Sequence, residues 1–165
     1  MRLNLKDIIV APGAALPFEF QLDLSDLEFN GECPISEPVS VTGQVKNTAG
    51  ALVLNAEART NLHLTCDRCA AAFVREKVLR YETLLATELE DEENDDILLL
   101  EGDELDVGEA VTTAFILDMD TKNLCKEDCK GLCPTCGVNL NEKTCGCGKR
   151  EVDPRLAALA QLLDP

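Results

Sequence analysis

The chain has 165 residues, enough for one domain with a hydrophobic core and an appendage, and 45% of its residues are apolar, as in ordinary globular proteins. No segment approaches the roughly 20 apolar residues of a membrane-spanning helix, and the N-terminal residues lack the apolar run of a signal peptide. The net charge of −16 is concentrated in residues 82–120, which carry 15 acidic and no basic side chains. This segment would repel nucleic acid and attract a basic protein. We therefore expect an acidic, cytoplasmic protein whose thiols stay reduced.

The first half of the chain shows the period-two alternation that is typical of half-buried strands. Apolar side chains alternate over residues 17–24, 39–45 and 52–65, and residues 73–85 predict a further strand. Cys66 and Cys69 fall between the last two of these strands, at the tip of a predicted hairpin. The pattern predicts a mainly antiparallel sheet that could close into a barrel.

A helix is predicted after this sheet. Residues 88–96 form an acidic run without an apolar pattern, which predicts a mobile loop, and residues 97–100 predict a short strand. Asp106 can cap a helix over residues 107–119, with Glu109 completing a capping box. The predicted apolar face of this helix contains Val107, Ala110, Val111, Ala114 and Leu117.

Residues 121–165 predict a cysteine-rich tail that ends in a helix. The tail is too short to bury a core of its own, so a bound metal would have to hold its shape. Asp153 and Pro154 are suited to open the terminal helix. We therefore predict an α+β protein with one or two helices beside the sheet. Residues 1–120 would be a sheet-rich core domain with an acidic loop at 88–106, and residues 121–165 would be a zinc-ribbon-like tail.

Eight of the nine cysteines occur in pairs with the spacing of zinc ligands. Two knuckles, Cys133-Pro-Thr-Cys136-Gly and Cys145-Gly-Cys147-Gly, together predict one four-thiolate zinc site. Two groupings are open for the other pairs. Cys125 and Cys129 could join Cys66 and Cys69 and staple the tail to the sheet, or they could join Cys133 and Cys136. We favour the staple, because an isolated exposed dithiol would be a liability in the cell.

Other interpretations of these residues are less favoured. A redox role for Cys66 and Cys69 needs a helix N-terminus to lower the first thiol pKa, and a hairpin tip offers none. Cys33 is expected to be a half-buried apolar residue, and His63 a residue on the face of a strand. Four-thiolate sites are closed, and no nucleophile or phosphate-binding motif occurs, so we predict structural zinc, with one or two sites, and no catalytic residues.

Basic side chains gather around the cysteines and are candidates for contact with RNA or a partner. The alternative is that they only keep a small metal module soluble, or offset the negative charge of the thiolates. The candidates are Arg68, Lys126, Lys130, Lys143, Lys149 and Arg150.

The order of these motifs resembles the YceD family, the large ribosomal RNA subunit accumulation proteins of bacteria and plastids. The residues that carry the resemblance are Cys66-x-Arg68-Cys69, Cys125-x3-Cys129-Lys-Gly-Leu-Cys133-Pro-x-Cys136-Gly-x-Asn139-Leu-Asn141, Cys145-x-Cys147 and Asp153-Pro-Arg155-Leu. The resemblance implies a role in accumulation or processing of the large-subunit ribosomal RNA. It also implies that the last four cysteines are dispensable in some members.

Three functions follow as hypotheses. The first is a non-enzymatic factor for large-subunit ribosomal RNA accumulation and ribosome assembly, whose partner is that RNA or a pre-ribosomal particle. The alternative is an acidic holding protein for a basic ribosomal protein, with the contact on residues 88–106. An RNA-acting enzyme is disfavoured for want of an acid–base set. Neither a membrane nor a small-molecule substrate is expected as a partner.

Overall fold

The structure, a computed structural model, describes residues 1–87 and 97–147, and contacts within the chain divide it into two units. The first unit comprises Met1–Leu64 and Phe73–Lys122, and the second comprises Thr65–Ala72 together with the chain from Asn123 onward. The predicted acidic loop at 88–96 and the predicted terminal helix lie outside the described residues. In the part of the chain that is described, no helix has the length and apolar character needed to cross a membrane.

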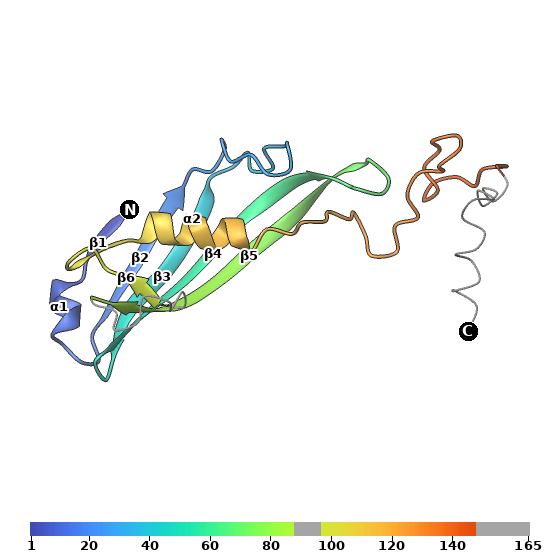
Figure 1. The fold of residues 1–165 in the computed structure, drawn as a ribbon. Coiled ribbons are helices and arrows are strands. Elements are labelled where there is room, and N and C mark those ends of the chain that lie inside the picture. The colour runs from blue at the N-terminus through green and yellow to red at the C-terminus, as the bar shows by residue number, and fades with distance from the viewer. Residues whose placement is uncertain (88–96, 148–165) are drawn as a thin grey trace, which may run out of the picture. The chain divides into compact units, whose positions relative to one another are not determined.

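The first unit contains a five-stranded sheet and a separate pair of short strands (Figure 1). The sheet order is β2 (Ala15–Leu22), β3 (Val39–Thr48), β4 (Ala51–Thr65), β5 (Ala72–Ala86) and β6 (Ile97–Leu99). β3 runs antiparallel to both β2 and β4, whereas β6 runs parallel to β5. β1 (Arg2–Asn4) and β7 (Glu104–Asp106) form the second, antiparallel sheet. The two helices in the described ranges are α1 (Lys6–Ile9) and α2 (Val107–Leu117), so the predicted α+β class is confirmed.

The sheet does not close into a barrel. β2 and β6 stand at opposite ends of the strand order and do not pair with each other. A closed barrel would bury the apolar face of the sheet inside itself. Here α2 lies across that face instead, and residues of α2 and of the sheet share one hydrophobic core (Figure 1). The segment predicted as an acidic loop at 88–106 is also not a loop throughout, because it contains β6 and β7.

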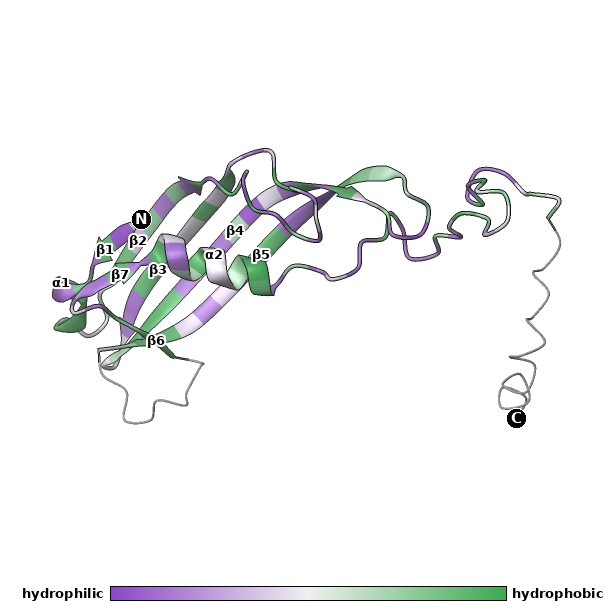
Figure 2. Ribbon diagram, turned by 45° about the horizontal axis from the view of Figure 1, so that its top comes forward, coloured by the Kyte–Doolittle hydropathy of each residue, from purple (hydrophilic) through white to green (hydrophobic). Residues whose placement is uncertain are grey.

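The predicted alternation is visible along the long strands (Figure 2). On β4 every second residue from Leu52 to Leu64 is buried, and the intervening residues face outward. Gly43 on β3 stands opposite Phe18 on β2. A Cβ atom at Gly43 would lie 2.6 Å from the Phe18 ring and 2.2 Å from the Asn55 carbonyl oxygen, so only glycine fits this close approach.

Helix α2 begins as predicted. The Asp106 side chain accepts a hydrogen bond from the Glu109 N–H at 3.2 Å, and this bond lowers the pKa of the Asp106 carboxyl. The predicted apolar face is wrong at its end, because Leu117 is 81% exposed whereas Phe115 is fully buried. Phe115 follows Val111 by four residues and therefore shares its face, while Leu117 lies beyond the edge of the buried face.

One buried polar side chain connects the sheet to the N-terminal segment. Asn47 on β3 is fully buried. Its amide nitrogen donates to the carbonyl oxygens of Ile8 and Ile9, and its oxygen accepts from the Gly50 N–H. A buried amide is tolerated here because it is hydrogen-bonded through both its nitrogen and its oxygen.

Candidate metal centres

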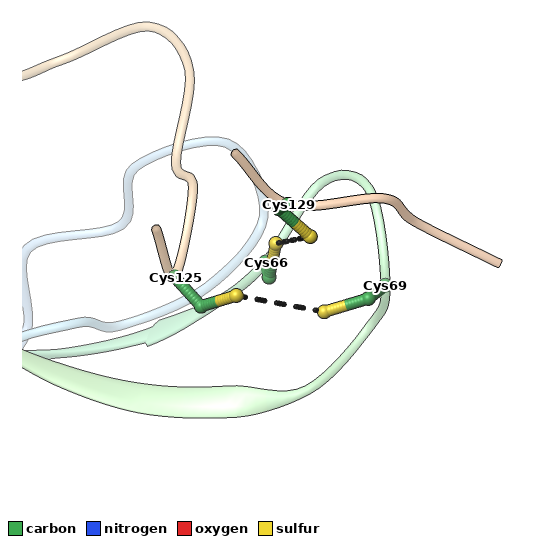
Figure 3. A group of neighbouring side chains, drawn as sticks. All are labelled: Cys66, Cys69, Cys125 and Cys129. Atoms are coloured by element: carbon green, nitrogen blue, oxygen red, sulfur yellow. Dashed lines mark hydrogen bonds between the residues drawn. The ribbon is translucent and has the colours of Figure 1, made fainter. Parts of the chain in front are cut away.

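The structure brings the eight paired cysteines together in two groups of four, and within each group the sulfur atoms lie within 4.8 Å of one another. The first group, here called the clamp tetrad, is Cys66, Cys69, Cys125 and Cys129 (Figure 3). The second group, the ribbon tetrad, is Cys133, Cys136, Cys145 and Cys147. Cys125 and Cys129 therefore lie with the hairpin-tip pair, which is the grouping favoured above. Both tetrads belong to the second unit, which includes the hairpin tip.

A tight turn at the hairpin tip positions the first two sulfurs of the clamp tetrad. The Cys66 N–H donates to the Ala71 carbonyl, and the Ala70 N–H donates to the Cys66 carbonyl, both at 2.9 Å. Ala70 has φ of 54°, a left-handed conformation that usually favours glycine. The turn therefore carries backbone strain directly after the second cysteine.

Asp67 in the same turn holds the segment that leads to Cys125. The Asp67 N–H donates to the Asn123 carbonyl at 2.8 Å, and the Asp67 carboxylate accepts from the Asn123 N–H at 2.6 Å. This reciprocal pair fixes the chain two residues before Cys125. The third cysteine of the clamp tetrad is thus placed by the same turn that supplies the first two.

The ribbon tetrad is built on the predicted knuckle at Cys133. The Cys133 N–H donates to the Val138 carbonyl at 2.8 Å, and the Gly137 N–H donates to the Cys133 carbonyl at 2.9 Å. Gly137 has φ of 72°, so glycine directly after Cys136 allows the turn without steric strain. This tetrad is less buried than the clamp tetrad, with Cys136 exposed.

The sulfur positions in the clamp tetrad fit a tetrahedral thiolate site. Cys66 and Cys129 sulfurs are 3.8 Å apart, and those of Cys69 and Cys125 are 3.7 Å apart. Four sulfurs at about 2.3 Å from a central zinc ion define a tetrahedron with edges of about 3.8 Å. All four side chains point inward toward one another (Figure 3). Each tetrad can therefore hold a metal ion, and thiolate donors suit soft or borderline cations.

The thiol pKa values differ within each tetrad. The Cys125 N–H lowers the pKa of Cys66 to about 6, whereas burial and the neighbouring thiols raise the pKa of Cys125 to about 12. The expectation that nothing at the hairpin tip would lower the pKa of Cys66 is therefore wrong, because a backbone N–H takes the place of a helix N-terminus. In the ribbon tetrad, the Cys136 N–H lowers the pKa of Cys133 to about 6. Neighbouring thiolates repel one another, so full ionisation of four of them requires a cation among them.

Asn141 connects the two tetrads. It belongs to the segment between the two ribbon knuckles, yet its amide nitrogen donates to the Cys129 sulfur of the clamp tetrad at 3.3 Å. Burial opposes ionisation of Cys129, but this bond and one from the Gly131 N–H lower its pKa. The Asn141 oxygen in turn accepts from the Lys130 N–H at 2.9 Å, and the Leu140 N–H donates to the Gly131 carbonyl. The sequence analysis named Asn141 only as part of the family motif, and no local pattern distinguishes it from the other polar residues between the two knuckles.

Gly131 makes a close approach to the hairpin tip within the second unit. Its φ is 75°, and a Cβ atom there would lie 2.9 Å from the Arg68 carbonyl oxygen. The same carbonyl accepts from the Leu132 N–H at 3.0 Å. Glycine is therefore required between the two tetrads for both its conformation and its lack of a side chain.

The basic candidates have different surroundings. Arg68 donates to the Cys129 carbonyl at 2.9 Å, so it also supports the clamp tetrad. Lys126 lies 3.9 Å from Asp128, a weak exposed ion pair. Lys130 and Lys143 are exposed and form no ion pair with another described residue. Lys149 and Arg150 lie outside the described residues.

Two other sequence expectations can be placed. Cys33 is exposed, not half-buried as predicted. It follows a turn at Asn30 and Gly31, which both have positive φ. His63 is exposed on the outward face of β4, where it was expected. Neither residue belongs to a tetrad.

Comparisons with known proteins identify relatives of the chain. The family model described as "Large ribosomal RNA subunit accumulation protein YceD" matches residues 54–163, a range that includes both tetrads. The chain is 28% identical to the chloroplastic YCED homolog 1 of Arabidopsis thaliana over 78% of this chain and 50% of that protein. It is 24% identical to the uncharacterized protein YlbN of Bacillus subtilis over 99% of this chain and 96% of that protein.

A Mycobacterium tuberculosis relative, the uncharacterized protein Rv2926c, is 29% identical over 99% of this chain and 70% of its own length. The chain thus spans about half the length of the Arabidopsis relative. No solved structure matches the chain. A family match over more than half of the chain, and over both tetrads, establishes that this protein belongs to the YceD family.

Proposed function

We propose that this protein is a non-enzymatic factor that supports accumulation of large-subunit ribosomal RNA and ribosome assembly, with structural zinc in both tetrads. The observation that carries the proposal is the family match over residues 54–163, because the family's name implies a role in accumulation of that RNA. The working location would be the cytoplasm. The partner would be the RNA or a pre-ribosomal particle.

The donor chemistry supports zinc as the metal. Each tetrad supplies four cysteine sulfurs and no histidine or carboxylate. Such a set fills a tetrahedral coordination sphere, so zinc held there would stabilise the fold and would offer no open position to a substrate. Four thiolates and one Zn²⁺ leave a charge of about −2 at each site, which the surrounding basic side chains offset.

The tail is the proposed contact surface. In this proposal residues 1–120 form the core domain, and residues 121–165 form a metal-organised tail that uses the hairpin tip as part of its site. Metal binding would hold Lys130 and Lys143 in fixed positions on short turns next to the ligands. Lysines that are free of ion pairs with described residues are suited to phosphate contacts, which give affinity without sequence specificity.

The proposal is tested by crosslinking to RNA in cells and by charge reversal. Lys130→Glu together with Lys143→Glu should reduce crosslinking to large-subunit RNA at least tenfold, because each lost phosphate contact weakens salt-dependent binding. Lys6→Glu together with Lys46→Glu, which reverses two exposed lysines outside the tail, is the matched control and should have little effect. Unchanged crosslinking in the double variant would contradict RNA contact by the tail.

Zinc content is measured separately by elemental analysis of the full chain. The proposal expects two zinc ions per chain, and one if only one tetrad retains its metal. A chain that is folded in its second unit without any metal would contradict the structural role of zinc.

A further inference from the structure

We infer that the groove between β6 and helix α2 is a docking site for a Lys/Arg-rich polypeptide segment that also carries apolar side chains. The groove lies in the first unit and has a volume of about 470 Å³. The inference does not depend on RNA contact by the tail. It gives the basic-protein hypothesis a site, which includes Glu101, Glu104 and Asp106 from the 88–106 segment of that hypothesis and adds residues of α2.

The floor of the groove is apolar. Tyr81 on β5, Leu98 on β6 and Leu105 on β7 line it from the strands, and Ala110 and Ala114 line it from α2. Small alanine side chains on the helix leave room that larger residues would fill. The floor can therefore accept aliphatic or aromatic side chains from a partner.

Two leucines at the margins of the groove are exposed. Leu99 is 53% exposed and Leu117 is 81% exposed, and both line the groove. Leu117 is the last residue of α2 and lies beyond the face that packs on the sheet. Exposed apolar side chains beside an apolar floor are typical of an interaction site.

The rim of the groove is acidic. Glu101, Glu104, Asp106 and Glu109 all line it, and no lysine or arginine does. Arg2 approaches Glu104 at 3.9 Å and Asp106 at 3.4 Å. Glu101 and Glu109 form no ion pair with any described residue, so their charges are available to a cationic partner.

This charge pattern selects among the possible occupants. RNA is excluded by repulsion from the rim carboxylates. A second copy of the chain would bring two molecules of net charge −16 together. Residues 148–165 contain three acidic and three basic side chains, so this segment lacks the net positive charge that would complement the rim. A basic polypeptide with apolar anchors matches both the floor and the rim.

The probe is a labelled 18-residue peptide with leucine at helical spacing and lysine elsewhere. The full, zinc-loaded chain is added to this peptide at about 150 mM salt, and the fluorescence anisotropy of the peptide reports binding. Glu101→Lys with Glu109→Lys should weaken binding at least about tenfold, since both rim charges become repulsive. Glu19→Lys with Glu28→Lys changes the net charge equally at exposed sites outside the groove and should have less than a threefold effect.

The apolar requirement is tested in the same assay. Leu117→Ser should weaken binding about threefold to tenfold, whereas Val10→Ser, which alters a similarly exposed residue elsewhere, should not. A peptide with serine in place of every leucine should bind at least tenfold more weakly.

Three results would overturn the inference. The first is that both pairs of glutamate substitutions weaken peptide binding equally, and the second is that the serine peptide binds as tightly as the leucine peptide. The third is sedimentation showing a dimer that only the groove pair converts to monomers. Lys130→Glu with Lys143→Glu should leave peptide affinity unchanged, so failure of the groove and failure of the RNA proposal are distinguishable.

Discussion

Removal of the Asn141 amide should weaken metal binding at the clamp tetrad, although Asn141 lies in the sequence between the ribbon knuckles. The amide nitrogen donates to the Cys129 sulfur at 3.3 Å and to the Asn139 oxygen at 2.8 Å. Asn141→Ala deletes the hydrogen bond to sulfur and leaves Lys130, whose N–H is exposed, to bond with water. The lost hydrogen bond to the Cys129 sulfur should therefore have a larger effect than the lost hydrogen bond from the Lys130 N–H.

The magnitude follows from the type of bond that is lost. A hydrogen bond to a charged acceptor contributes about 1.5–3 kcal/mol. At about 1.4 kcal/mol for each tenfold change, the zinc dissociation constant of the clamp tetrad should rise about tenfold to a hundredfold. Asn141→Asp should have a larger effect, because a carboxylate would face the thiolate.

Competition with a chromogenic zinc chelator measures both dissociation constants. Asn61→Ala, which alters an exposed asparagine on β4, is the control and should change neither. A twofold or smaller change at the clamp tetrad in Asn141→Ala would refute the reasoning. A double-mutant cycle with Cys145→Ser and Cys147→Ser tests the coupling, since Asn141 should matter less once the ribbon tetrad no longer positions it.

Three further outcomes are expected. Ala70→Gly should raise the free energy of unfolding of the second unit by about 0.5–1 kcal/mol, because it relieves the strain of φ at 54°, and an unchanged melting temperature of the zinc-loaded chain would contradict this. Asn47→Ala should lower the free energy of unfolding of the first unit by about 3 kcal/mol, measured by urea denaturation, because it leaves the Ile8, Ile9 and Gly50 backbone groups unpaired. Zinc chelation should remove hydrogen-exchange protection around Cys133 while β3 and β4 stay protected, and uniform loss would show that the units do not unfold separately.

The local features of the fold could be predicted from the sequence. The alternation on β4 and the Asp106 cap depend on neighbouring residues, so pattern and capping chemistry were sufficient. The predicted apolar face of α2 was wrong at the C-terminal end of the helix. Positions four apart identify Phe115 as buried, but the exposure of Leu117 depends on where the sheet beneath α2 ends.

The amino-acid sequence by itself determined the chemistry of the candidate sites, because cysteine spacing limits which thiols can close a tight turn around one ion. Only the tertiary structure decided that Cys66 and Cys69 lie with Cys125 and Cys129. These pairs are more than 50 residues apart, and their meeting depends on the hairpin tip and the reciprocal Asp67–Asn123 hydrogen bonds. The Asn141 bond to Cys129 and the acidic groove beside α2 also depend on segments that are distant in sequence, for which local spacing carries no information.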